Sequence, residues 1–213
     1  MKKRRTFTHK FGLNLAYGRF SELAVELHGL RESPPYVKPG SGKRTGEILR
    51  FVRGLRLSAQ IIYILRDHLS GSDLEISWGH LLDETNASCS PECDIIIHKK
   101  GHLRKWNGGE HPIMDFRFIE ASKAQAVVSC KSSLTDIDRA YPKGLQRYGV
   151  KKVFLFAECC RNDHFKALTL QAKQAGYAAL GCLYFTHAKN EGFKTDEKIH
   201  KHFIDSVRKA VGE

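Results

Sequence analysis

Residues 124–131 read AQAVVSCK, an apolar stretch that ends in a charged side chain. The valines at 127 and 128 favour a buried β-strand. Because side chains alternate along a strand, Ser129 and Lys131 share one face and Cys130 lies on the other. Burying an ammonium group is costly unless it has a partner. Lys131 therefore either reaches solvent at the end of the strand or faces an anion there.

A second short strand is predicted at residues 94–98, which read DIIIH. Three consecutive isoleucines are β-branched and favour a core strand. Asp94 precedes them, so it lies where this strand begins or bends. The segment Ser90-Pro91-Glu92-Cys93 leads into it.

The remaining pattern predicts an α/β protein with a mixed central sheet flanked by helices and an N-terminal helical part. We expect a single domain over residues 1–213, with a mainly helical lead-in at 1–70 and a sheet-containing core at 71–213. Residues 99–115 are polar and are expected to be irregular. Helices are predicted at 11–30, 45–69, 132–147, 163–176 and 195–211, and further strands at 74–78, 116–119, 152–157 and 178–185.

The charge of the chain narrows the class of partner. Its 213 residues include 35 Lys and Arg against 23 Asp and Glu, a formal net charge of +12. A positive surface favours polyanions, of which nucleic acid is the commonest, although an acidic membrane surface or a simply basic enzyme fits the charge too. No apolar run approaches 18 residues, which excludes a membrane span. Without an apolar stretch after the basic start, and with six cysteines read as reduced thiols, we expect a cytoplasmic protein.

The two strands together resemble the PD-(D/E)XK nuclease superfamily. Pro91 and Asp94 open the first strand, and the second closes on Ser129-Cys130-Lys131. The string VSCKSSL is similar in particular to type II restriction endonucleases in which Ser replaces the acidic residue of the motif. The resemblance covers residues 44–160 and implies a restriction-endonuclease-like fold.

What the resemblance implies is Mg²⁺-dependent hydrolysis of DNA phosphodiester bonds. Asp94 would bind the cation through oxygen, and Lys131 would orient the attacking water and offset transition-state charge. Glu47 matches a Glu that often joins the metal shell from the preceding helix, but a first-turn acid also stabilises a helix dipole. The catalytic candidates are Asp94, Lys131, Glu47 and Ser129, and the metal candidates are Asp94, Glu47 and Cys130.

One departure from the family's motif concerns the metal directly. The hydroxyl of Ser129 binds Mg²⁺ far more weakly than the carboxylate it replaces. The sequence offers Glu47, Glu120 or Asp138 as sources of the missing charge, and it does not decide among them.

The implied partner is double-stranded DNA. The basic insert at 99–123 is either a DNA-contacting loop or a solvated excursion. A palindromic site would match a two-fold homodimer, and any DNA methyltransferase of such a system must be a separate chain. The candidate nucleic-acid contacts are Lys43, Arg44, Lys99, Lys100, Arg104, Lys105 and Arg139.

Two other interpretations stay open. Loss of the acidic residue at Ser129 would leave a nuclease-fold module that binds nucleic acid without cutting it, and an unrelated α/β enzyme or interaction domain is a third class. Cys89 and Cys93, with His98 and His102 nearby, could hold zinc, although the spacing differs from the usual zinc knuckles.

Overall fold

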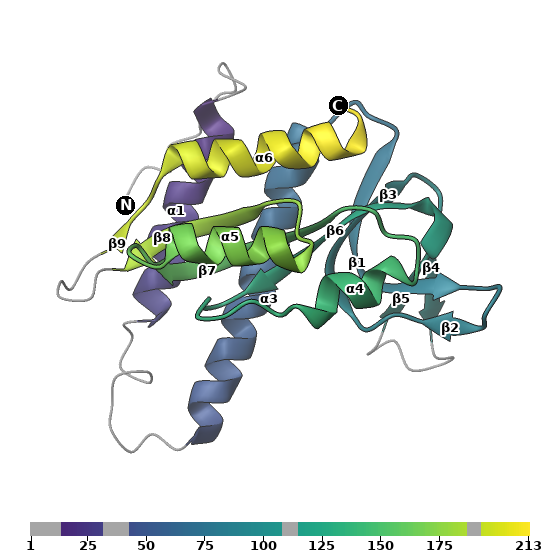
Figure 1. The fold of residues 1–213 in the computed structure, drawn as a ribbon, viewed down its shortest axis with the longest axis horizontal. Helices are drawn as coiled ribbons and strands as arrows, with labels where there is room; N and C mark the ends of the chain where they lie inside the picture. The colour runs from purple at the N-terminus through teal and green to yellow at the C-terminus, as the bar shows by residue number, and fades with distance from the viewer. Residues whose placement is uncertain (1–13, 32–42, 108–114, 187–192) are drawn as a thin grey trace, which may run out of the picture.

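The computed structural model describes residues 14–31, 43–107, 115–186 and 193–213, and within them nine strands form one mixed sheet (Figure 1). The strand order is β4-β5-β1-β3-β6-β7-β8-β9, with β2 paired to β1. The strands are β1 (Leu74–Asp83), β2 (Ser88–Cys89), β3 (Cys93–Lys99), β4 (Leu103–Asn107), β5 (Asp115–Glu120), β6 (Ala124–Lys131), β7 (Val153–Arg161), β8 (Leu180–Thr186) and β9 (Phe193–Lys194).

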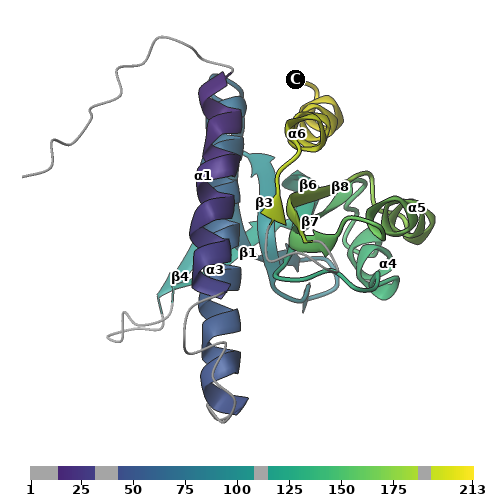
Figure 2. The same cartoon turned by 90° about the vertical axis from the view of Figure 1, so that its left-hand side faces the viewer.

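Helices cover both faces of this sheet, which confirms the predicted α/β architecture. Figure 2 shows α1 and α3 side by side against one face, with α4 and α5 on the other. Helix α6 packs with α1 and α3 on the first face. The bounds are α1 (Asn14–Arg31), α3 (Lys43–His68), α4 (Ala140–Gln146), α5 (Phe165–Ala175) and α6 (Glu197–Val211), with a 3-10 turn η1 at Ala121–Lys123.

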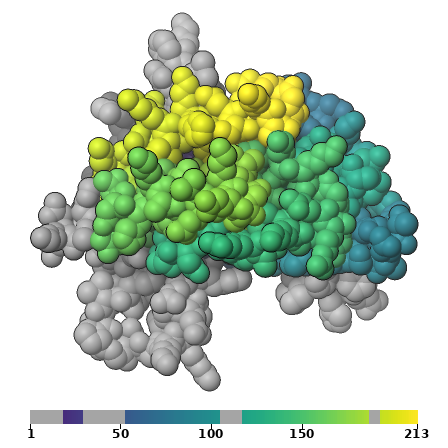
Figure 3. Space-filling model, in the orientation of Figure 1, coloured from purple at the N-terminus to yellow at the C-terminus, as the bar shows by residue number. Residues whose placement is uncertain are grey.

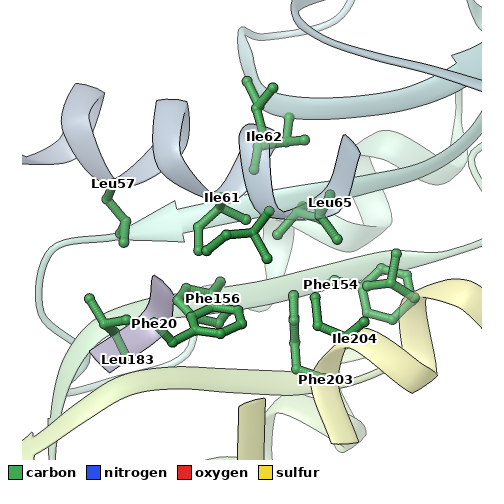
Figure 4. Packing of buried hydrophobic residues seen from close by; sticks show 14 of the residues in the cluster. Phe20, Leu57, Ile61, Ile62, Leu65, Phe154, Phe156, Leu183, Phe203 and Ile204 are labelled. Atoms are coloured by element: carbon green, nitrogen blue, oxygen red, sulfur yellow. The ribbon is translucent and has the colours of Figure 1, made fainter. Parts of the chain in front are cut away.

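The core explains why the central strands read as nearly continuous apolar runs. Strand β7 buries side chains on both faces, as strands inside a helix-covered sheet must. On the side of α1, α3 and α6, Phe156 stacks on Phe20 with 5.8 Å between ring centroids and meets Phe203 edge-on at 4.9 Å (Figure 4). Leu57 and Ile61 of α3 complete this layer.

The two strands singled out in the sequence are neighbours in the sheet. β3 runs antiparallel to β6 with Ile95 opposite Val128, and β6 runs parallel to β7. The start of β3 therefore lies beside the end of β6, where parallel α/β strands commonly carry functional side chains.

Two predicted segments differ from the structure. Residues 132–147 do not form one helix, because only α4 (Ala140–Gln146) is helical. Before it, Leu134 bridges to Cys160 of β7, and the backbone N–H of Leu134 donates to the carbonyl of Cys159. The Asp138 carboxylate then accepts the N–H groups of Ala140 and Tyr141, so the helix starts late.

The expectation that residues 99–115 are irregular is wrong for residues 103–107 and 115, which belong to strands, while residues 108–114 lie outside the described part of the structure. β4 pairs antiparallel with β5, and β5 pairs parallel with β1. Ile119 is buried on this extension, whereas Arg104 is exposed. A pair of strands with one buried face needs only a few apolar residues. The polar composition of residues 99–115 therefore gave no sign of the β4–β5 pairing.

None of the described helices is both long enough and apolar enough to cross a bilayer.

Candidate functional site

Asp94 meets the end of β6 through a backbone hydrogen bond. The ladder between β3 and β6 begins at Ile95 and Val128, so Asp94 lies just beyond its end. One carboxylate oxygen, Oδ2, accepts the N–H of Cys130 at 2.7 Å. The hydroxyl of Ser129 lies 3.5 Å from the same oxygen, at the limit of a hydrogen bond. The structure thus gathers the two motif strands around one carboxylate.

The surroundings of Asp94 act on its charge in opposite directions. Burial raises the pKa of this carboxyl above its ordinary value and is the largest cause. The hydrogen bond from Cys130 and the positive charge of Lys131 act to lower it, but they do not outweigh burial. Lys131 itself is exposed at the end of β6. A partly desolvated carboxylate beside an accessible ammonium group is an arrangement that a cation or a phosphate would stabilise further.

Cys130 contributes its backbone rather than its thiol. Its side chain packs against the core on the α3 side, where burial raises the pKa of the thiol. A protonated sulfur is a poor ligand, and Mg²⁺ prefers oxygen. The geometry therefore favours Cys130 as the donor that orients Asp94, not as a metal ligand.

A cavity of about 460 Å³ opens beside Asp94, between β3 and the helix α3. Glu92 also lines it, and the negative charge of Glu92 raises the pKa of Asp94, so the two carboxylates are electrostatic neighbours. The sequence pattern alone does not single out Glu92. The available signal was its position two residues before Asp94, because side chains at i and i+2 of an extended segment share a face. The other lining residues are Leu55, Ser58, Ala59, Ile62 and Trp78.

Trp78, which lines this cavity, has a cationic side chain packed over its ring. Trp78 is 38% exposed, and the guanidinium carbon of Arg117 lies 4.9 Å from the centre of its ring. Such cation–π pairs hold an arginine in place while leaving donors for an anion. Trp78 was missed in the sequence because an alternating strand gives no sign of which aromatic side chain reaches an opening.

The donor set fits a hard divalent cation. Asp94, Glu92 and Ser129 offer oxygen, and Mg²⁺ commonly takes one or two carboxylates while keeping several waters for substrate phosphates to replace. Within the described residues no three His, Cys, Asp or Glu side chains gather closely enough to enclose a metal ion. An open, water-rich Mg²⁺ site is compatible with that finding, whereas a closed zinc site at Cys89 and Cys93 is not supported by it.

The other carboxylates predicted as metal ligands belong to three different parts of the chain. Glu47 belongs to the first turns of α3, and its side chain lies outside the described part of the structure. Glu120 accepts a hydrogen bond from Ser122 and lies near His102 and Lys123. Asp138 begins α4, as described above. Neither Glu120 nor Asp138 is among the groups whose charge or hydrogen bond acts on Asp94.

The predicted basic contacts are spread over the molecule. Lys99 lies at the far end of β3, about 17 Å along the strand from Asp94. Lys100 donates to the carbonyl of Ser72 at 2.6 Å, and Arg104 pairs with Glu84. Arg139 is exposed just before α4, whereas the side chains of Lys43, Arg44 and Lys105 lie outside the described part.

A second groove, of about 560 Å³, lies between α5 and α6 on the face shown in Figure 3. Phe165 and Tyr177 contribute aromatic surface, Lys173 and Lys198 contribute charge, and no carboxylate lines it. Because no carboxylate lines this groove, it does not offer a metal ion the acidic oxygen ligands that the cavity beside Asp94 offers.

Comparison with solved structures identifies the fold. NucC of E. coli MS115-1 in its cAAA-bound form aligns with a TM-score of 0.60 at 11% identity, over 98% of this chain and 93% of that one. NucC of P. aeruginosa ATCC27853, also cAAA-bound, aligns with a TM-score of 0.56 at 12% identity, over 97% and 98%. No protein-family model matches the sequence, and no curated protein does. The chain therefore has the restriction-endonuclease-like α/β fold seen in NucC, while the Ser-x-Lys variant of the motif stays a prediction.

Proposed function

We propose that this protein is a metal-dependent endonuclease that hydrolyses phosphodiester bonds of double-stranded DNA. The observation that supports the proposal is that Asp94, at the start of β3, accepts the N–H of Cys130 and lies 3.5 Å from the Ser129 hydroxyl, with Lys131 next along β6. The same overall fold occurs in NucC, a restriction-endonuclease-like nuclease. The net charge of +12 favours a polyanionic substrate.

Each group would have a distinct task in the reaction. A bound Mg²⁺ would polarise the scissile phosphate and lower the pKa of its water. Asp94 would hold the ion, with its carboxylate oriented by the Cys130 N–H. Lys131, exposed on the same strand end, would contact the phosphate oxygens and offset the charge that develops on them. Glu47 remains a further candidate ligand from α3.

The biological role we propose is defence against foreign DNA. Both similar structures are of NucC with cAAA bound. We therefore propose that an activating cyclic oligonucleotide controls this enzyme. A type II restriction role with a partner methyltransferase has no support from these comparisons. Self-association is part of the proposal, with the number of subunits left to measurement.

The experiment is a plasmid-cleavage assay with the full chain, with and without Mg²⁺ and with and without cAAA. Wild-type protein should convert supercoiled plasmid to cut forms only with Mg²⁺. Lys131→Ala should slow cleavage at least about 100-fold, because it removes a charge that stabilises the transition state. Lys151→Ala is the matched control. Lys151 is exposed beside the start of β7, at the opposite end of the sheet from Lys131, so its removal should leave the rate unchanged.

The competing role, a module that binds nucleic acid without cutting it, predicts a different result in this assay. It gives a gel shift with no cleavage under any metal or nucleotide condition. That outcome would refute the nuclease proposal.

A further inference from the structure

Strand β6 offers no carboxylate to a cation bound at Asp94. Ser129 is 1% exposed and offers only a hydroxyl. Of the three acidic residues that the sequence proposed as substitutes, Glu120 and Asp138 form hydrogen bonds within their own segments, and the side chain of Glu47 lies outside the described part of the structure. A second negative ligand for the ion at Asp94 must then come from another element.

Glu92 occupies a suitable position. It precedes Asp94 by two residues at the start of β3, a separation of about 6.6 Å in extended chain, so the two side chains leave the backbone on the same side. Both line the 460 Å³ cavity under α3. Side chains of this length can converge on one ion across such a gap.

The environment leaves the Glu92 carboxylate available. Glu92 is exposed at the mouth of the cavity, and within the described residues no ion pair or side-chain hydrogen bond engages it. Two carboxylates that line one cavity repel each other, and a divalent cation bound between them would relieve that repulsion.

We propose that Glu92 is the second carboxylate ligand of the divalent cation that Asp94 binds, and that it replaces the acidic residue absent at Ser129. This inference rests on the proposed nuclease function. Two carboxylates would balance the charge of Mg²⁺, and the remaining positions would be filled by water and substrate phosphate. Both acidic ligands would then come from residues 92–94, where the chain enters β3, instead of one from β3 and one from β6.

The test measures metal binding without DNA, so it does not depend on turnover. Mn²⁺ is titrated into the full-length protein and followed by calorimetry and by loss of the free-ion electron paramagnetic resonance signal. Wild type should bind one ion, Asp94→Asn should abolish binding, and Glu92→Gln should weaken it at least about tenfold, because ligand charge sets affinity. Glu22→Gln, at an exposed site on α1, is the matched control and should bind as wild type. A thermal melt of each variant confirms that it is folded.

A rescue variant separates a ligand from a residue that acts only through general charge. Glu92→Gln combined with Ser129→Asp should regain metal affinity, because a carboxylate returns to the position that β6 lacks. Wild-type affinity in Glu92→Gln, with binding still lost in Asp94→Asn, would overturn the role of Glu92 and leave the nuclease proposal intact. Absence of Mn²⁺ binding by the wild type would overturn both.

Discussion

At the scale of single residues, the clearest departure from the sequence pattern is a buried acid inside an apolar strand. Glu158 of β7 is fully buried, forms an ion pair with Arg53 of α3 and accepts a hydrogen bond from the hydroxyl of Tyr184 at 2.7 Å. The pair ties α3, which forms the wall of the Asp94 cavity, to the centre of the sheet. Buried charges of this kind are tolerated only when they are paired and hydrogen-bonded.

Tyr184→Phe tests this buried contact. The change removes one hydroxyl from a charged acceptor and should lower the free energy of unfolding by about 1–3 kcal/mol. Urea denaturation measures it. Tyr63→Phe is the control, because Tyr63 is 55% exposed and should change stability by less than about 0.5 kcal/mol. Equal effects of the two substitutions would show that the Glu158 contact contributes nothing.

At the scale of elements, β1 connects the cavity to the β4–β5 extension. Gly79 has φ +142°, and a Cβ there would meet the carbonyl oxygen of Arg117 and lie 2.9 Å from its Cβ. Only glycine permits this approach, which carries Arg117 over Trp78 at the cavity border.

Gly79→Ala should therefore destabilise the protein by about 1–3 kcal/mol through overpacking and backbone strain. Gly54→Ala is the opposite case, since a Cβ at Gly54 within α3 meets nothing within 4 Å. It should stabilise the helix by about 0.5–1 kcal/mol. Chemical denaturation of both variants gives the comparison, and a Gly79→Ala protein as stable as wild type would refute the close approach.

The strands and helices also show which parts of the fold can be predicted from the sequence alone. Strands 124–131 and 94–98 were recognisable because β-branched residues and a terminal charge are local signals. The β4–β5 pairing and the shortness of α4 were not, because each depends on a partner distant in sequence. Asp94 and Lys131 carried motif signals, whereas Glu92 and Trp78 acquire interest only once α3 forms the wall of a cavity around them.

At the scale of the whole molecule, the fold separates its charges. The acidic pair lies at the start of β3, while Lys99 and Lys100 lie at its other end, about 17 Å away. Residues 95–98 between these two ends are buried inside the helix-covered sheet. A duplex that reaches Asp94 and Lys131 must therefore approach the end of the sheet at which they lie, and it cannot run along β3.

The most direct measurement is a crystal structure of the protein with a DNA duplex and Ca²⁺, which occupies such sites without supporting rapid cleavage. The account predicts an ion bound to a carboxylate oxygen of Asp94 and a backbone phosphate within about 4 Å of the Lys131 ammonium nitrogen. DNA bound elsewhere on the surface, with the ends of β3 and β6 free of both ion and phosphate, would contradict it.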